Sequence, residues 1–369
     1  MISVLVVDDS ALVRRLVTSV LEQADGIEVV GTASNGEVAL RKVDELKPDL
    51  VTLDIEMPVM DGLTALRELH RRHPRLPVIM FSTLTQSGAA ATLEALSAGA
   101  SDYITKPTNG VSLTASLIEV GDQLVPRVRA LAGRNNRPTL PPALANSQPK
   151  PPVATRPGAR PQRAIVPRVI AIGSSTGGPE ALAKVLGSLG DRPNVPIVVV
   201  QHMPPVFTGM LAKRLDRLGP ATVIEAGDRE VLQPGTVYIA PGGRHLEVRQ
   251  RGDSVVTVLH DHDPENFSRP SVDVLFRSVA ATYPSSAIAV VLTGMGHDGC
   301  QGAQQIGRTG SLVLAQDQAT SVVWGMPGAV TEAGLADTVL PIDAIGPYLT
   351  KSLGGGRRVT LNAPAGAAS

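Results

Sequence analysis

Residues 3–10 read SVLVVDDS, an aliphatic and β-branched run that ends on two aspartates. Four similar short runs follow before residue 130, and longer amphipathic stretches separate them. Short strands that alternate with helices are typical of a parallel sheet covered by helices. The sequence therefore predicts a five-stranded α/β domain over residues 1–130. Its predicted strands are Ser3–Val7, Glu28–Ala33, Leu50–Leu53, Val78–Phe81 and Asp102–Ile104.

A second alternation of strands and helices occupies residues 167–353. Its apolar runs are of the kind buried on both faces of a parallel sheet. Shorter runs between Gly-rich turns lie in the middle, and we expect them to be partly antiparallel. The prediction is a doubly wound α/β domain with a mostly parallel but mixed sheet. The buried strands are predicted at Arg168–Ile172, Ile197–Val200, Ala287–Leu292 and Ser311–Leu314, and the shorter ones at Thr236–Ala240, Leu246–Gln250 and Ser254–Val258.

The segment between the two units, residues 131–166, is rich in proline and has no periodicity. No Asp or Glu occurs between Asp122 and Glu180, so this segment is also basic. Such composition predicts an extended, solvated linker. Residues 354–369 carry no pattern that could form a core, and we expect a disordered tail there.

Charge and cysteine content exclude several classes of protein. Lys and Arg number 34, as do Asp and Glu, so no net charge attracts nucleic acid or an anionic membrane. Cys300 is the only cysteine, which excludes an intrachain disulfide framework and favours a reducing compartment. No signal peptide is recognisable, and the apolar runs fall far short of the ~20 residues that span a bilayer. We expect a cytoplasmic protein without membrane insertion, and a monomer by default because aromatic residues are few.

Three aspartates follow strands of the first predicted sheet. Asp8 and Asp9 come directly after the first strand, and Asp54 comes after the third. The carboxyl ends of parallel strands share one edge of a sheet, so these carboxylates should lie together. They would repel one another unless a divalent cation such as Mg²⁺ bridged them, although any one of them could instead cap a helix. Thr83 and Lys106 follow the fourth and fifth strands and add a hydroxyl and an ammonium to the same edge.

These residues, with the strings VVDDS, DIEMPVMDG and DYITKP, resemble the response-regulator receiver family. The resemblance implies a flavodoxin-like (βα)5 fold and phosphorylation of Asp54 by a histidine kinase. It also implies that Asp8, Asp9, Asp54 and the backbone carbonyl of Glu56 hold Mg²⁺. Lys106 would contact the phosphoryl group, Thr83 would reorient toward it, and Tyr103 would move with Thr83.

A serine lies in a glycine-rich turn after the first strand of the second unit. Residues 173–179 read GSSTGGP, which contains Gly-x-Ser-x-Gly around Ser175, and a helical stretch follows. Glycines permit a tight turn that exposes such a serine near the positive end of the next helix. Glycine-rich turns also bind phosphates, but no Walker lysine and no complete Gly-x-Gly-x-x-Gly occurs here. Ser175 is therefore the candidate nucleophile.

A serine nucleophile needs a base, and His202 stands just after the strand Ile197–Val200. Asp298 follows the strand Ala287–Leu292 and could orient that histidine, since all three strand ends should meet at one sheet edge. Alternatives remain open at this point. They are His245 in a Gly-rich turn and His297 beside Asp298 as the base, and Asp317 as the orienting carboxylate.

The strings GSSTGGP, VVVQHMPP, YIAPGGRH, LTGMGHDG and DQATSVVWGMP resemble the catalytic domain of chemotaxis protein-glutamate methylesterases. The resemblance implies a triad of Ser175, His202 and Asp298, with Thr176 and the Met295 region supporting an oxyanion. It implies hydrolysis of glutamate methyl esters on chemoreceptor helices and deamidation of receptor glutamines. It also implies that the ester chemistry needs no cofactor. The expected partners are a chemotaxis-type histidine kinase and methylated chemoreceptor helices. His297 departs from the small residue expected at its position.

Two further hypotheses concern how the enzyme is regulated and to which functional class the protein belongs. Tethering a switch domain to an enzyme makes an intramolecular block easy to form, so the unphosphorylated first domain should cover the catalytic edge. The rival class is a phosphorylation-dependent docking regulator whose second domain is catalytically inert. A transcription factor is disfavoured because the second unit lacks a helix-turn-helix pattern and a basic recognition helix.

Overall fold

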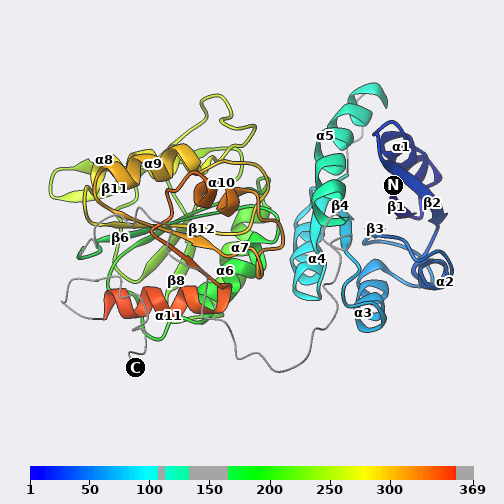
Figure 1. The fold of residues 1–369 in the computed structure, drawn as a ribbon, viewed down its shortest axis with the longest axis horizontal. Helices are drawn as coiled ribbons and strands as arrows, with labels where there is room; N and C mark the ends of the chain where they lie inside the picture. Colours follow the sequence, from blue (N-terminus) through cyan, green and yellow to red (C-terminus); the bar gives the residue numbers. More distant parts are fainter. Residues whose placement is uncertain (107–112, 133–164, 355–369) are drawn as a thin grey trace, which may run out of the picture.

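The computed structural model describes residues 1–106, 113–132 and 165–354. These residues form two α/β bodies, one from each half of the chain (Figure 1). The predicted linker lies outside the described residues except at its two ends, and the predicted tail lies outside them except for Gly354. No helix within the described ranges is both long and apolar enough to cross a membrane.

The first domain is the predicted five-stranded parallel sheet, with the strand order β2-β1-β3-β4-β5. Its helices begin where a polar side chain caps the free backbone N–H groups of the first turn. Ser10, Asn35, Asp61 and Thr85 cap α1 to α4 in this way. The elements are β1 (Ile2–Val7), α1 (Ala11–Glu22), β2 (Ile27–Ala33), α2 (Gly36–Leu46), β3 (Leu50–Asp54), α3 (Gly62–Arg72), β4 (Val78–Ser82), α4 (Gln86–Ser97), β5 (Asp102–Thr105) and α5 (Leu113–Ala132).

The second domain is built on a seven-stranded sheet of order β14-β13-β12-β6-β7-β9-β8, and all neighbouring strands in it pair in parallel. The elements are β6 (Val169–Ser174), α6 (Gly178–Gly187), β7 (Ile197–Gln201), α7 (Phe207–Leu215), β8 (Thr222–Glu225), β9 (Thr236–Ile239), β10 (His245–Arg251), β11 (Ser254–His260), α8 (Val272–Thr282), β12 (Ala287–Val291), α9 (Cys300–Arg308), β13 (Leu312–Gln316), α10 (Met326–Glu332), β14 (Thr338–Leu340) and α11 (Ile342–Leu353).

One strand prediction in this domain was wrong in its direction. We expected Thr236–Ala240 to belong to a partly antiparallel region, but β9 pairs in parallel with both β7 and β8. Among the named strands of the described residues, antiparallel pairing occurs between β10 and β11, which form a separate two-stranded hairpin. A Gly turn indicates that the chain reverses, but it does not reveal which sheet the following strand joins.

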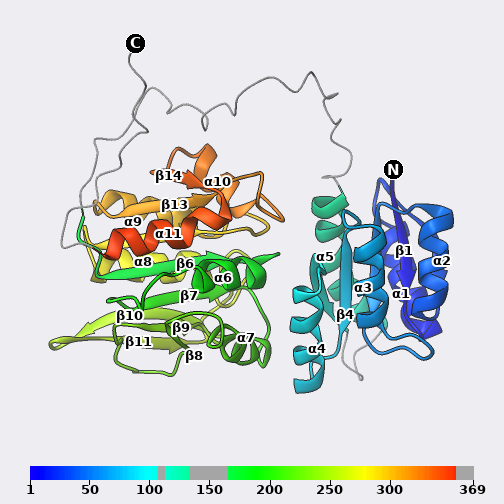
Figure 2. The same cartoon turned by 90° about the horizontal axis from the view of Figure 1, so that it is seen from below.

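Helices cover both faces of the central sheet, as doubly wound folds require. Side chains of β6 and β7 alternate between two apolar clusters: Ile170 packs with α6, α7 and α11, while Ala171 packs with α8 and α9. Figure 1 shows α8 and α9 on one side of the strands and α6 and α11 on the other, and Figure 2 looks onto the side of α6 and α11. The strands β6, β7, β12 and β13 are buried along their whole length, so their carboxyl ends form a rigid edge.

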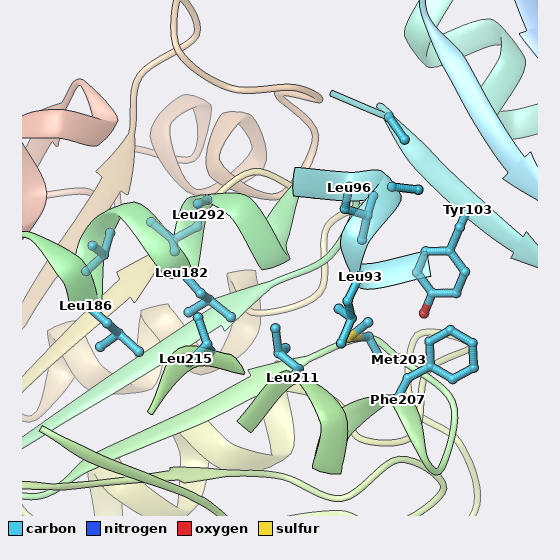
Figure 3. Close-up of a cluster of buried hydrophobic side chains, with 14 of the residues drawn as sticks. Leu93, Leu96, Tyr103, Leu182, Leu186, Met203, Phe207, Leu211, Leu215 and Leu292 are labelled. Carbon is cyan, nitrogen blue, oxygen red and sulfur yellow. The ribbon is translucent and has the colours of Figure 1, made fainter. Parts of the chain in front are cut away.

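The two domains touch through α4 and β5 of the first and α6 and α7 of the second. Leu93 and Leu96 belong to the same buried apolar cluster as Leu211 (Figure 3). The ring of Tyr103 stacks on that of Phe207, with centroids 5.1 Å apart and planes 6° from parallel. Because both rings are buried, separating the domains would expose a sizeable apolar area to water.

Candidate active site

Ser175 sits at the turn between β6 and α6, at the carboxyl edge of the sheet. Its N–H donates to the Thr293 carbonyl over 3.0 Å, and its own carbonyl accepts from the Gly178 N–H over 2.7 Å. Gly177 has φ +74, a conformation that favours glycine. A Cβ at Gly178 would overlap the side-chain amide of Gln201, so this turn also requires glycine for close packing.

Gln201 fastens the nucleophile turn to the neighbouring strand. Its Oε1 accepts from Ser174 Oγ over 2.7 Å, and its Nε2 donates to the Ser175 carbonyl over 2.9 Å. The same Nε2 lies 3.2 Å from the His202 carbonyl. Gln201 was not among the predicted site residues, although a glutamine that ends the apolar run of β7 was the available signal.

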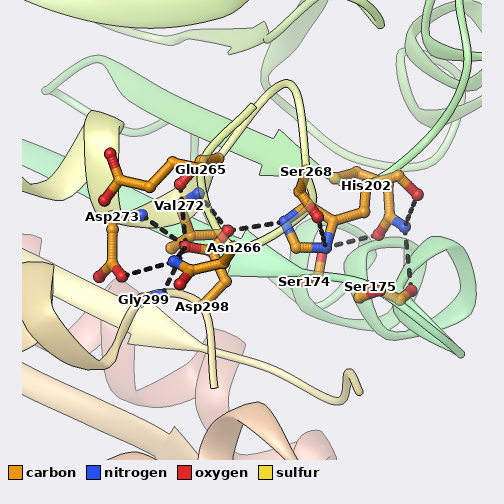
Figure 4. Close-up of polar contacts among 12 residues, drawn as sticks. Ser174, Ser175, His202, Glu265, Asn266, Ser268, Val272, Asp273, Asp298 and Gly299 are labelled. Atoms are coloured by element: carbon orange, nitrogen blue, oxygen red, sulfur yellow. Dashed lines mark hydrogen bonds and ion pairs between the residues drawn. The ribbon is translucent and has the colours of Figure 1, made fainter. Parts of the chain in front are cut away.

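His202 follows β7 and faces Asp298 across the sheet edge (Figure 4). Its Nε2 lies 2.8 Å from Asp298 Oδ2, and its Nδ1 lies 3.4 Å from Ser268 Oγ. No hydrogen bond between His202 and the Ser175 hydroxyl is present within the described part of the chain. Since Asp298 occupies Nε2, the ring nitrogen left to accept a proton is Nδ1.

Asp298 is a buried anion held at the N-terminus of α8. A helix N-terminus offers free N–H groups and a positive dipole end, which together stabilise a carboxylate. Burial alone would raise the pKa of Asp298, but His202 and the backbone N–H groups outweigh it and hold this pKa far below its usual value. The donors besides His202 are Ser271 Oγ, the N–H groups of Val272, Asp273 and Gly299, and Asn266 Nδ2, all at 2.7–3.0 Å.

Asn266 and Asp273 belong to this network but were not among the predicted site residues. Asn266 Nδ2 donates to Asp298 Oδ1 and to Asp273 Oδ2, each over 2.9 Å. Asp273 is fully buried, and this burial raises its pKa. Both residues lie in or beside the loop before α8, whose sequence carries no motif that singles them out.

The rival residues have other partners. His245 is buried, accepts from the Ser271 N–H at Nδ1 and lies 3.1 Å from the Asp263 carbonyl at Nε2, so it supports the loop under the site. His297 is exposed. Asp317 accepts from the N–H and hydroxyl of Thr320 at 3.0 and 2.6 Å. Of the carboxylates in the described ranges, Asp298 is the one hydrogen-bonded to His202.

Thr176 and Met295 flank the nucleophile. The Thr176 hydroxyl donates over 2.7 Å to Asp102 Oδ2, a carboxylate of the first domain. A Cβ at Gly294 would stand only 2.9 Å from Ser175 Cβ, so the backbone next to Met295 lies against Ser175. Met295 also packs against the apolar cluster of the first domain. The other domain therefore touches both residues predicted to support the oxyanion.

The acidic site of the first domain brings Asp8, Asp9 and Asp54 together, with carboxylate oxygens within 4.8 Å of one another. Lys106 Nζ lies 3.0 Å from Asp8 Oδ2 and 2.8 Å from Asp54 Oδ1. Burial raises the pKa of Asp54 to about 6, against the opposing effect of the Lys106 hydrogen bond. The capping alternative fails here, because Ser10 caps α1 and Asp61 caps α3.

This cluster fits a hard divalent cation, since it offers carboxylate oxygens on one side of a sheet edge. Asp54 Oδ2 is buried and has no hydrogen-bond partner among the described residues, so an oxygen is available for a ligand. Glu56 gives a backbone hydrogen bond to Asp54, and the metal-binding role of its carbonyl stays a prediction. Thr83 follows β4 and pairs with the Thr85 hydroxyl at 3.1 Å.

Comparison with known proteins matches both halves of the chain. Residues 4–118 match the response regulator receiver domain, and residues 170–349 match CheB methylesterase. The catalytic domain of a CheB methylesterase from Thermotoga maritima is 46% identical, with a TM-score of 0.49, and the match covers 50% of this chain and 98% of that one.

Two curated relatives match along nearly their whole length. A protein-glutamate methylesterase/protein-glutamine glutaminase from a Nocardioides species is 51% identical over 100% of this chain and 99% of its own. One of the same name from Trichodesmium erythraeum is 45% identical over 95% and 99% of the two chains. With a receiver domain followed by a CheB methylesterase domain, the chain belongs to the protein-glutamate methylesterase/protein-glutamine glutaminase family.

Proposed function

We propose that this protein hydrolyses glutamate methyl esters on chemoreceptors and deamidates receptor glutamines, under the control of phosphorylation at Asp54. Ser175 acts as the nucleophile, His202 as the general base and Asp298 as the group that orients and stabilises the histidine. The observation that carries the proposal is the 2.8 Å contact between His202 and an ionised, buried Asp298 at the sheet edge that also presents Ser175.

In the proposed reaction, Ser175 Oγ attacks the ester carbonyl carbon while His202 Nδ1 takes the hydroxyl proton. The C–O bond to the methoxy group then breaks, and His202 returns the proton so that methanol leaves. Water, deprotonated by the same histidine, hydrolyses the acyl-enzyme to a glutamate carboxylate and free Ser175. A glutamine substrate releases ammonia instead. Backbone N–H groups at Thr176 and Met295 are the proposed oxyanion donors, an effect worth about 3 kcal/mol per donor.

The proposed division of labour follows the two units. Residues 1–130 form the phosphorylation switch, residues 131–166 the linker, residues 167–353 the hydrolase and residues 354–369 the tail. Asp8, Asp9, Asp54 and the Glu56 carbonyl would hold Mg²⁺, which neutralises phosphoryl oxygens during transfer to Asp54. The proposed ester chemistry uses groups of the chain itself and no cofactor. A histidine kinase of the chemotaxis type supplies the phosphoryl group to a cytoplasmic, monomeric protein.

The contact between the domains supports autoinhibition. Asp102 accepts from the hydroxyl of Thr176, the residue next to the nucleophile, and Met295 packs against the first domain. A phosphoryl group on Asp54 would draw Thr83 and Lys106, and Tyr103 would then leave its stack on Phe207. Shifting the ratio of closed to open protein from 99:1 to 1:99 requires that phosphorylation stabilise the open state by about 5.5 kcal/mol relative to the closed state. A smaller stabilisation would give a partial activation.

A direct test of the enzyme is methanol release from methylated receptor membranes, measured with and without a phosphodonor and Mg²⁺. We expect Ser175→Ala to abolish release, because the neighbouring hydroxyls of Ser174 and Thr176 already donate to Gln201 and Asp102. The exposed Ser254 provides the control, and Ser254→Ala should behave as the wild type. Receptor binding without methanol release by the wild type would instead favour an inert docking regulator.

Asp298→Asn should lower kcat by about 10³ to 10⁴-fold with little change in KM, since the amide cannot stabilise the imidazolium. Because folding lowers the pKa of Asp298, its ionised form stabilises the native state above pH ~4, and this contribution is lost as the pH falls below that value. Asp317→Asn is the matched control and should retain kcat within a few-fold. A larger loss for Asp317→Asn than for Asp298→Asn would reverse the assignment.

Weakening the domain contact should raise activity without phosphorylation. Phe207→Ala removes the ring on which Tyr103 stacks, and Leu93→Ala removes an apolar contact from the other side of the interface. We expect each variant to release methanol faster than the wild type before phosphorylation and to respond less to a phosphodonor. Leu12→Ala, at an exposed position on α1, is the control. If both interface variants stay folded by thermal melting and keep the wild-type basal rate, autoinhibition through this contact is wrong.

A further inference from the structure

We propose that Phe267 is a specificity-determining residue, whose exposed ring packs against the receptor segment that carries the glutamyl ester. The proposal rests on the function proposed above and adds the surface by which the protein distinguishes a receptor helix from a free ester. Phe267 lies in the loop between β11 and α8, and this loop contains none of the predicted site residues.

Phe267 is the most exposed of the large hydrophobic residues in the described part of the chain. Its relative exposure is 103%, whereas the other three phenylalanines, Phe81, Phe207 and Phe276, are at most 2% exposed. Exposing a large aromatic side chain forgoes the favourable burial that drives folding. This exposure is found with the first domain docked on the second, so the docked receiver does not cover the ring.

The backbone at Phe267 is strained as well. Glu265 and Ser268 exchange two backbone hydrogen bonds of 3.1 and 3.0 Å, so Asn266 and Phe267 are the two central residues of a tight turn. Their φ values are +52 and +60. A turn with positive φ at both central positions favours Asn followed by Gly, because a side chain at the second position is crowded. Asn266 suits its position, and Phe267 stands where glycine would relax the chain.

The turn is nevertheless held firmly. Asn266 is anchored to Asp298 and Asp273, and Glu265 forms a two-point ion pair with Arg277 of α8 at 2.6 Å for each contact. Strain that persists because the surroundings impose it is concentrated at functional sites. A residue that costs stability through both its backbone and its exposed ring is best explained by a contact made in the bound state.

The turn also places Phe267 between two residues that contact the catalytic groups. Ser268, the next residue, approaches His202 Nδ1 at 3.4 Å, and Asn266, the preceding one, contacts Asp298 (Figure 4). A glutamyl ester that reaches His202 and Ser175 must project from a helix whose body rests on the rim of the site. An apolar ring on that rim fits the aliphatic side chains of an amphipathic receptor helix within a turn of the ester.

The test compares a receptor with a small substrate. We would measure methanol release from methylated receptor membranes and from a methyl-esterified glutamyl dipeptide, with phosphodonor and Mg²⁺ present. Phe267→Ala should raise KM for the receptor about tenfold, as the loss of a buried aromatic contact predicts, and should leave kcat/KM for the dipeptide within about twofold. Phe267→Leu should restore much of the receptor KM. Val231→Ala, at a half-exposed position of the same domain, is the control.

A glycine variant separates the structural cost from the functional gain. Phe267→Gly should raise the melting temperature, because glycine adopts positive φ without strain, and should still raise KM for the receptor. If Phe267 had a merely structural role, its replacement by glycine would not both raise the melting temperature and weaken receptor binding.

Several outcomes would overturn the proposal. One is an equal loss on both substrates, and another is an unchanged receptor KM while the wild type releases methanol. A wild type that releases no methanol would instead refute the proposed function. If the dipeptide reacts too slowly, co-sedimentation with membranes replaces the kinetic comparison. The Ser175→Ala variant and the Ser175→Ala/Phe267→Ala double variant are compared, and the double variant should bind more weakly to receptor-bearing membranes but not to membranes without receptor. A dimer of the wild type that Phe267→Ala dissolves would make a second copy of the chain the occupant.

Discussion

A buried carboxylate that must stay ionised organises the catalytic domain. Asp298 is almost completely buried, and burying a charged carboxylate is unfavourable unless several hydrogen-bond donors surround it. The donors come from the N-terminus of α8, from the turn that carries Asn266 and from His202. Segments distant in sequence thus have to meet at one point, and the histidine is oriented as a result. The stability of the fold and the geometry of the site therefore depend on the same hydrogen bonds.

One short strand of the first domain contacts both its own acidic site and the hydrolase. Within β5 and the residue after it lie Asp102, which binds the Thr176 hydroxyl, Tyr103, which stacks on Phe207, and Lys106, which pairs with Asp54. Side chains alternate along a strand, so a small movement of β5 shifts contacts with the acidic site and with the hydrolase together. We therefore propose that β5 transmits the change from the phosphorylated carboxylate to the catalytic edge directly, without a long series of intervening residues.

The sequence predicted what depends on strand ends and on chain order. Apolar runs followed at once by Asp8, Asp54, Ser175 or His202 predicted the positions of these residues, because parallel strands end at a shared edge. The short strands β8 and β14 were not foreseen, since four and three partly exposed residues carry little pattern. Gln201, Asn266 and Asp273 were missed for a different reason: a buried polar residue is recognised by the partners it meets after folding, and these lie far away in the chain.

The most direct measurement is covalent labelling of the intact protein with a fluorophosphonate, followed by peptide mass spectrometry. Ser175 and Ser268 both lie near His202, and the label distinguishes them because it reports which hydroxyl is activated. We expect a single adduct on the peptide that contains Ser175, formed faster after phosphodonor and Mg²⁺ are added. An adduct on Ser268, or labelling of Ser175 at a rate that phosphorylation does not change, would contradict the claim that the receiver controls a Ser175 nucleophile.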